Sequence, residues 1–373
     1  MRLIRKELNM LLSNCLQVLL FTFFFVLALV ITHSVVAEKL LADLDYESKS
    51  ALNGPFDLEL VREIKNEHGE YFVQKERQTG TFDAEAEAEV ILKRTYAEVY
   101  EDDAAFLEGV INSSSSPEAS AKAQEILNHF SFYYSSGWQG YFREYGDGYS
   151  SVPLWIAIIA SVIALGSNLL CAEYTLGSWI LVGTTPKGKT GIIIRKFLAL
   201  SLFGVGILIL LHFTAILTLR ASGELSLIGK RVSEVFHIVP LWDPTLLGGI
   251  LFNLFFSILA ILIAISVVLL ISALLKNALL TMVANVLVLL ITPRILNGVL
   301  GLRPLCFPQN VIGIFSVTLQ SGFGSNALTS FFNRRPFLGN SPALTVVYIS
   351  FISLSIVVIN LSLTRKFVRE WYR

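Results

Sequence analysis

The chain has 373 residues, of which 54% are hydrophobic and only 16% are charged. A soluble domain of this length would need far more polar surface, so the composition excludes an ordinary soluble protein and predicts membrane spans. The formal net charge of +0 averages two unlike regions. Residues 38–150 hold 23 of the 29 acidic residues but 10 of the 29 basic ones, which leaves 6 acidic and 19 basic residues elsewhere. The two regions are therefore expected to lie in different environments.

Cysteine and histidine usage argues against metal chemistry. The three cysteines lie far apart, in or near apolar segments, and the five histidines are scattered. A metal site would need closely spaced ligands of these types, so none is expected. Because the acidic region has no cysteine, it must fold without disulfides. The residues concerned are Cys15, Cys171, Cys306, His33, His68, His129, His212 and His237.

The first apolar segment, residues 11–37, is long enough to cross about 30 Å of hydrocarbon as a helix. Before it, charged and apolar residues alternate over residues 2–9, as in a helix lying at a membrane surface. Residues 1–37 are therefore predicted to form an amphipathic N-terminal helix and a first span. A signal peptide is the alternative, because residues 35–37 loosely resemble a cleavage site. The apolar stretch exceeds the usual core of about 7–15 residues, which favours an uncleaved span.

Residues 38–150 form the predicted acidic extracytoplasmic domain. A turn at 66–69 between two partly alternating segments indicates a β-hairpin over 56–77. Helices are expected over 82–110 and 117–132. The last stretch of the domain is dense in Tyr, Trp and Phe, which indicates either an aromatic belt at the membrane surface or the packing residues of a small core.

Five further spans are predicted in the membrane domain, residues 151–373. They lie near 152–172, 197–219, 246–270, 278–291 and 344–363. Between the last two, a segment near 300–342 is rich in Gly, Pro and Phe. Its apolar middle is too short to cross, so a re-entrant or interfacial segment is expected there. The expected fold class is an all-α polytopic membrane protein with six transmembrane helices and a mixed, mostly helical extracytoplasmic domain between the first and second helices.

Lysine and arginine in the short loops set the expected orientation. With the N-terminus in the cytoplasm, 12 of these residues in the termini and short loops face the cytoplasm and 7 face the opposite side. Because cytoplasmic loops carry the excess of positive charge, both termini are predicted to be cytoplasmic and the acidic domain to lie outside.

Residues 183–190 match the string GxxxxGK[ST] of a phosphate-binding loop. Such a loop needs a parallel sheet to hold it and an acidic residue on a neighbouring strand for the magnesium ion. Only roughly 25 residues separate the two spans here, too few for the βαβ unit that the loop requires. The match is therefore interpreted as a coincidence.

The segment from Glu173 to Lys196 connects the second and third spans. In its simplest interpretation it is a short basic loop that fixes the topology. Its details indicate more: an apolar face over 179–182 is followed by a turn at Thr185 and Pro186 and then by a basic tip. This pattern predicts an amphipathic helix at the membrane face that would present a firm surface to a cytoplasmic partner.

This segment resembles the membrane-permease subunits of type-2 ABC exporters. In that family, a Glu near the end of the second span precedes a Gly-Thr or Gly-Ser step, a leucine-rich coupling helix, a Thr-Pro turn and a Gly-Lys pair that enters the third span. The matching residues are Glu173, Gly177, Ser178, Leu181, Thr185, Pro186 and Lys196. Arg195 replaces the family's Gly, so that pair matches in part. Residues 271–277 also resemble the family's Ser-containing turn, with Lys-Asn, between the fourth and fifth spans.

The resemblance implies a transport component and not an enzyme. The chain would bind no cofactor itself, and ATP and Mg would bind a separate ABC ATP-binding subunit that pushes on the segment from Glu173 to Lys196. A second permease copy or a paralogue would complete the exporter in the lipid bilayer of a cell membrane, most simply a bacterial one, and no nucleic acid is expected. Glu173 would pair with a basic neighbour or cap the coupling helix. The substrate is open, with an amphipathic or lipophilic molecule as the expectation.

Two other classes remain open. An ion-coupled secondary transporter usually places acidic residues in the middle of its spans, and no predicted span interior has one; its asparagines are more simply groups that hydrogen-bond between helices. A membrane immunity or sensor protein could bind a ligand through the acidic domain, but a sensor would also need a cytoplasmic signalling domain. An intramembrane enzyme would need a Ser/His or Asp/Asp pair at matching depth, and neither is present.

Overall fold

The computed structural model describes six stretches of the chain that are mostly helical. They are residues 15–36, parts of 51–142, 152–177, 188–236, 244–292 and 342–370. Within 51–142, the described residues are 51–55, 57, 59–64, 66, 92–93, 96–97, 100, 105–113, 117–128, 131–133, 135, 137–138 and 140–142. Outside these stretches lie the predicted amphipathic N-terminal helix over residues 2–9, the predicted coupling segment 178–187 and all but the last residue of the predicted re-entrant segment near 300–342.

Four helical segments are long and apolar enough to cross a membrane. They are Leu154–Thr175, Gly191–Ala221, Leu246–Leu275 and Val347–Glu370. Each overlaps a predicted span, so the structure has a helix of suitable length and apolarity at four of the six predicted places. Two shorter apolar segments, Val18–Val30 and Ala278–Ile291, lie within the other two predicted spans. The helices themselves are α2 (Cys15–Val36), α9 (Val152–Gly166), α10 (Cys171–Thr175), α12 (Gly188–Ala221), α14 (Leu246–Leu275), α15 (Ala278–Val286), its π-helical continuation η3 (Leu287–Ile291) and α20 (Pro342–Glu370).

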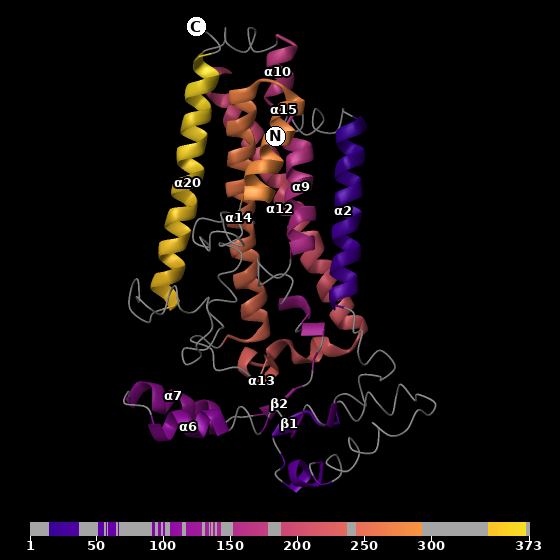
Figure 1. Ribbon diagram of the computed structural model, residues 1–373, viewed down its shortest axis with the longest axis vertical. Coiled ribbons are helices and arrows are strands. Elements are labelled where there is room, and N and C mark those ends of the chain that lie inside the picture. The colour runs from indigo at the N-terminus through magenta and orange to yellow at the C-terminus, as the bar shows by residue number, and fades with distance from the viewer. Residues whose placement is uncertain are drawn as a thin grey trace.

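The long helices form a bundle in which α9, α12 and α14 are central, with α2 against α9 and α20 against α14 (Figure 1). Small residues allow the central helices to approach closely. A Cβ atom added to Gly204 of α12 would lie 2.9 Å from Cγ2 of Ile261 on α14. One added to Gly166 of α9 would lie 2.7 Å from Cγ1 of Val268. Close backbone approach at small residues is a general way of packing helices in lipid, where burial of apolar surface between helices gives little driving force.

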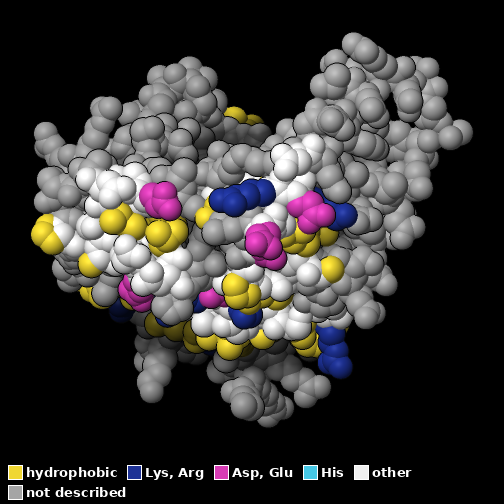
Figure 2. Space-filling view, turned by 90° about the horizontal axis from the view of Figure 1, so that it is seen from below, with side chains coloured by type: hydrophobic (Ala, Val, Ile, Leu, Met, Phe, Trp, Pro, Cys, Tyr) yellow, Lys and Arg dark blue, Asp and Glu magenta, His cyan; other side chains and the backbone are white. Residues whose placement is uncertain are grey.

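The acidic domain lies at the end of the bundle opposite α10 and α15 (Figure 1). It contains β1 (Gly54–Pro55), α6 (Ala105–Ser113), α7 (Pro117–Asn128) and β2 (Ser131–Phe132). The two short strands pair antiparallel, with Gly54 opposite Phe132. Viewed from this end, described acidic side chains lie close to basic ones, with apolar side chains between them (Figure 2). A small core of its own holds this domain together: Val61, Ile64, Leu92, Tyr96, Ala97 and Phe132 are all buried.

The predicted β-hairpin over 56–77 is wrong in its first arm, because residues 59–64 are helical. Asp57 begins this helix: its Oδ1 accepts hydrogen bonds from the backbone N–H groups of Glu59 at 2.9 Å and Leu60 at 3.4 Å. An Asp that satisfies the free N–H groups of a first turn is a strong helix start. The buried Val61 and Ile64 then lie one helical turn apart on the core side. The second arm lies outside the described residues.

The described aromatic residues that precede α9 are packing residues rather than a belt that faces lipid. Trp138, Tyr141 and Phe142 are buried in the same apolar core as the central helices. The rings of Tyr141 and His212 of α12 meet edge to face, with centroids 5.9 Å apart. Of the two interpretations of this aromatic stretch, the structure therefore supports a core for its described members.

A buried carboxylate fixes this stretch to the bundle. Glu224 begins the 3-10 helix η2 (Glu224–Gly229) just after α12, and it is almost fully buried. Its carboxylate accepts hydrogen bonds from the Ser135 hydroxyl and from the N–H groups of Gly137 and Trp138, both at 3.3 Å. The indole N–H of Trp138 donates to the Glu224 carbonyl at 2.9 Å. These bonds satisfy the buried polar groups, so the end of the acidic domain and the end of α12 form one packed junction.

Candidate functional site

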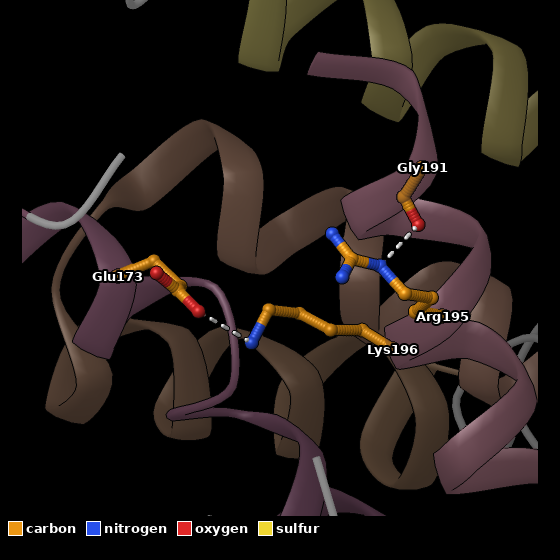
Figure 3. A network of polar contacts seen from close by, with 4 residues as sticks. All are labelled: Glu173, Gly191, Arg195 and Lys196. Atoms are coloured by element: carbon orange, nitrogen blue, oxygen red, sulfur yellow. Dashed lines mark hydrogen bonds and ion pairs between the residues drawn. The ribbon is translucent and has the colours of Figure 1, made fainter. Parts of the chain in front are cut away.

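Glu173 and Lys196 form an ion pair at the α10 end of the bundle. Nζ of Lys196 lies 3.1 Å from Oε1 of Glu173, and their side chains are 0% and 9% exposed. Glu173 comes from the short helix α10, and Lys196 comes from the third turn of α12 (Figure 3). Of the two roles expected for Glu173, the structure shows the pairing with a basic neighbour.

Burial makes this pair more than a surface contact. An ammonium group taken out of water is costly unless a carboxylate or other acceptors replace its hydration. Lys196 meets that requirement through Glu173, whose carboxylate points at it from the other segment (Figure 3). The neighbouring Arg195, which stands where the resembled family has Gly, points elsewhere: its Nε donates to the Gly191 carbonyl at 3.1 Å. The pair therefore joins the two chain segments that flank residues 178–187.

The Lys-Asn turn between α14 and α15 lies at the same end of the molecule (Figure 1). Lys276 has a left-handed backbone with φ of 56°, which stops α14. Asn277 then begins α15: its side chain accepts hydrogen bonds from the N–H groups of Leu279 at 3.0 Å and Leu280 at 3.1 Å. Each of the two turn residues thus has a separate backbone role in turning the chain sharply from one helix into the next.

The fold brings this turn and α10 together. The Cys171 Sγ lies 3.3 Å from the Ser272 hydroxyl, and Nζ of Lys276 lies 4.7 Å from the centroid of the Tyr174 ring. The described part of the first string that resembles the exporter family therefore meets the second string at one surface of the folded protein, although the two strings lie about 80 residues apart in sequence. Neither Cys171 nor Tyr174 was predicted to take part in this site. Their spacing of three residues, which places both on the same side of α10, is the signal that could have found them.

A buried polar cluster lies just below this surface. Its members are Ser167, Cys171, Ser272, Thr281 and Asn285, from four neighbouring segments. The Ser272 hydroxyl donates to the Ser167 carbonyl at 3.3 Å, and the Asn285 amide donates to the Ser167 hydroxyl at 3.4 Å. The Cys171 Sγ lies 3.4 Å from the Thr281 hydroxyl. This cluster connects the segments of α9, α10, α14 and α15 in the interior of the protein, away from the lipid-facing surface.

The structure places the other predicted coupling residues only in part. Gly177 ends the α10 segment with a positive φ of 65°, a conformation that a residue with a side chain rarely adopts. Ser178, Leu181, Thr185 and Pro186 lie outside the described residues, as does the first part of the string that matches a phosphate-binding loop. The last part of that string begins α12, which runs without a break from Gly188 to Ala221. The described sheet consists of β1 and β2, which are antiparallel and lie at the opposite end.

The described residues contain no group of three or more potential metal ligands among His, Cys, Asp and Glu. Two of the asparagines expected to bond between helices do so: Asn285 reaches Ser167, and Asn360 of α20 donates to the Ser266 hydroxyl of α14 at 2.9 Å. Asn253 of α14 does not fit that expectation, because neither atom of its buried amide has a hydrogen-bond partner within the described part of the chain.

Comparison with protein-family models, with curated proteins and with solved structures returns no match to this chain.

Proposed function

We propose that this chain is the transmembrane permease subunit of an ATP-binding cassette exporter. It would have six spans, with α2 and the segment Ala278–Ile291 added to the four spans above, both termini in the cytoplasm and the acidic domain outside. At about 1.5 Å per residue, the 22 residues of α2 are long enough to cross the hydrocarbon. A separate ATP-binding subunit would supply ATP hydrolysis, and a second permease copy or a paralogue would complete the exporter.

The observation that supports this proposal most is the buried ion pair between Glu173 and Lys196. It closes the base of the segment 178–187, which carries the remaining residues of the resemblance. A loop whose two ends are tied together can carry a push from a partner into the helices behind it. Lys196 belongs to α12, a single helix of 34 residues, so a force applied at this base reaches the full length of the bundle.

The neighbouring turn supports the same interpretation. Lys276 and Tyr174 place a cation and an aromatic ring beside the base of the loop. A partner that docks there would therefore touch α10 and the end of α14 at once. To drive transport, the partner's ATP-bound and ATP-free forms must contact this surface unequally, because a ligand shifts a conformational equilibrium only by its differential affinity for the two states.

The experiment is an affinity purification of the tagged full-length chain from its native membranes in mild detergent. We expect an ATP-binding subunit to co-purify with the wild-type chain and to be lost on deletion of residues 183–189. Glu173→Gln should weaken the association, because it leaves the base of the loop without its ion pair.

The matched control is Glu108→Gln, which alters an exposed carboxylate of α6 in the acidic domain. This variant should retain the ATP-binding subunit in full. If no ATP-binding protein accompanies the wild-type chain, or if deletion of 183–189 leaves its association unchanged, the proposal is wrong.

A further inference from the structure

A break in the helix lies between α9 and α10, at residues 167–170. The Ser167 N–H still bonds the Ile163 carbonyl in the α-helical manner, at 3.0 Å. The Leu169 N–H turns instead to the Gly166 carbonyl at 3.1 Å, a contact three residues back that is typical of a tighter turn. The α-helical pattern resumes with the Ala172 N–H and the Asn168 carbonyl at 2.8 Å. The chain thus changes its helical winding for one turn, in a segment without proline.

A side chain from a neighbouring helix explains the break. The Ser167 carbonyl accepts a hydrogen bond from the Ser272 hydroxyl of α14, at 3.3 Å. An inserted polar side chain is one of the few recognised causes of a sharp change in a helix, because it replaces a bond of the helical ladder. In a membrane-spanning helix, such a replacement also keeps the freed carbonyl satisfied.

The two sides of the break are held by different kinds of contact. On the α9 side, a Cβ atom added to Gly166 would lie 2.7 Å from Val268 and 2.8 Å from Leu200, so this part is packed closely between α14 and α12. On the α10 side, Leu170 packs in the apolar core and Glu173 pairs with Lys196, but the polar contacts to α14 and α15 are those of the Cys171 thiol with Ser272 and Thr281, at 3.3 and 3.4 Å. A thiol is a weak hydrogen-bonding group, so these contacts are the easiest in the cluster to break.

From this asymmetry we infer that residues 167–170 are a hinge, at which α10 leaves the polar cluster while α9 stays packed. Gly177, at the other end of α10, has a positive φ of 65°, a backbone conformation that glycine adopts without strain. The ion pair with Lys196 then carries the motion of α10 to α12. The inference holds whatever the protein transports, and it does not require the proposed function.

The test uses Cys171 as a reporter of hinge opening. In the full-length protein, Cys15→Ser and Cys306→Ser leave Cys171 as the single thiol. Its alkylation by N-ethylmaleimide in membranes is followed by mass spectrometry. Because Cys171 is 1% exposed, its thiol should react only when α10 departs from the cluster.

Ser272→Ala removes both the donor to Ser167 and the contact with the thiol. We expect it to raise the alkylation rate roughly fivefold, the change in an opening equilibrium that corresponds to one ordinary hydrogen bond. Ser266→Ala is the matched control, since Ser266 is equally buried on α14 but bonds Ile263 and Asn360 instead. The control should leave the rate unchanged.

Hydrogen exchange of the same proteins supplies the second measurement. The amides of 168–171 should exchange at least tenfold faster than those of 157–163, and Ser272→Ala should widen this gap. Equal protection on the two sides of the break would overturn the hinge. An equal rise in alkylation for Ser266→Ala and Ser272→Ala, or an unreactive Cys171 in every variant, would overturn it as well.

Discussion

Lys196 carries a charge that its neighbours must compensate, because its ammonium group is removed from water. It is fully buried, and its ammonium group pairs with the carboxylate of Glu173. Buried ion pairs contribute little net stability compared with apolar residues of the same size, but losing one partner is expensive because a bare charge stays behind. The role of such a pair is to fix the positions of the segments it joins, and here it joins the two ends of the loop between Glu173 and Lys196.

The first prediction concerns this pair. Glu173→Gln should lower the free energy of unfolding by about 3 kcal/mol, because Lys196 keeps its charge and loses its carboxylate. The double change Glu173→Leu with Lys196→Met should cost less than Glu173→Gln alone. Thermal unfolding in detergent measures both. Arg365→Met, at an exposed position of α20, serves as the control and should change stability by less than about 0.5 kcal/mol. Additive costs for the two members of the pair would contradict this account.

The second prediction concerns two asparagines in the bundle. Asn253 is fully buried, and its amide has no partner within the described residues, so Asn253→Leu should leave stability unchanged or raise it. Asn360→Leu should lower stability by about 1 kcal/mol, because it removes the bond to Ser266. Comparing the midpoints of thermal unfolding of the two variants provides the test, and the opposite order would show that Asn253 bonds a group outside the described part of the chain.

At the scale of single helices, some features are determined by neighbouring residues and others by contacts between residues far apart in the sequence. Asn277 caps α15 by accepting hydrogen bonds from two backbone N–H groups. A local signal of this kind can be recognised in the sequence. The break between α9 and α10 has no such local mark, because it depends on Ser272, more than 100 residues away. Long-range contacts also distinguish two glycines of α12. A Cβ atom added to Gly204 would meet α14, whereas one added to Gly206 would not.

The cap gives the third prediction. Asn277→Ala should cost about 1 kcal/mol of stability, since the first turn of α15 loses the acceptor for two N–H groups. Asn277→Asp keeps an acceptor at that position and should cost far less. Thermal unfolding of the two variants under identical conditions distinguishes them, and equal losses would mean that the side chain acts in some other way than as a cap.

The fourth prediction contrasts two glycines on one helix. Gly204→Ala should destabilise the protein by about 1–3 kcal/mol, because the new methyl group lies 2.9 Å from Ile261 and the packed helices must move apart. Gly206→Ala meets nothing within 4 Å, and alanine favours the helix, so it should be neutral or slightly stabilising. The difference in unfolding temperature between these variants is the measurement. Similar values for both would mean that α12 and α14 are not in close contact.

Length and apolar composition were enough to predict the places of the four helices that are long and apolar enough to cross a membrane. A pairing of Glu173 with a basic neighbour could be predicted. A Glu at the end of one span and a basic residue at the start of the next each carry a charge that is costly to bury alone. The hairpin over 56–77 failed because alternation in a short segment does not distinguish strand from helix, and the Asp57 cap decides the matter. The contact of Cys171 with Ser272 was beyond prediction, because it requires the packing of α10 against α14.

Across the full chain, the structure has a polar connection at each end of α12. At one end Lys196 pairs with Glu173, and at the other end Glu224 holds the stretch that closes the acidic domain. Both connections are buried, and a continuous helix joins them. The acidic domain is therefore built onto the bundle through a packed junction, and not only through its two chain connections.

The fifth prediction tests that junction. Glu224→Ala should lower stability by about 3 kcal/mol, because the buried Gly137 N–H and Ser135 hydroxyl would lose their acceptor, while the Trp138 N–H would keep only the Ser135 oxygen at 3.0 Å. Cleavage by trypsin or chymotrypsin near residues 131–142 should also become faster. Glu125→Ala removes an exposed carboxylate, 3.8 Å from Arg231 and 61% exposed, and should have almost no effect. Unchanged cleavage in Glu224→Ala would show that other contacts hold the junction.

The central claim is that the segment between Glu173 and Lys196 docks an ATP-binding subunit on the cytoplasmic side. Its most direct test is a photo-crosslinking amino acid placed at Thr185 in the full-length chain, with the same probe at Glu108 of α6 for comparison. Irradiation of native membranes, followed by mass spectrometry of the crosslinked species, identifies the neighbour at each position. The account predicts a crosslink from position 185 to an ATP-binding cassette subunit and none from position 108. A crosslink to that subunit from position 108, or the absence of one from position 185, would contradict it.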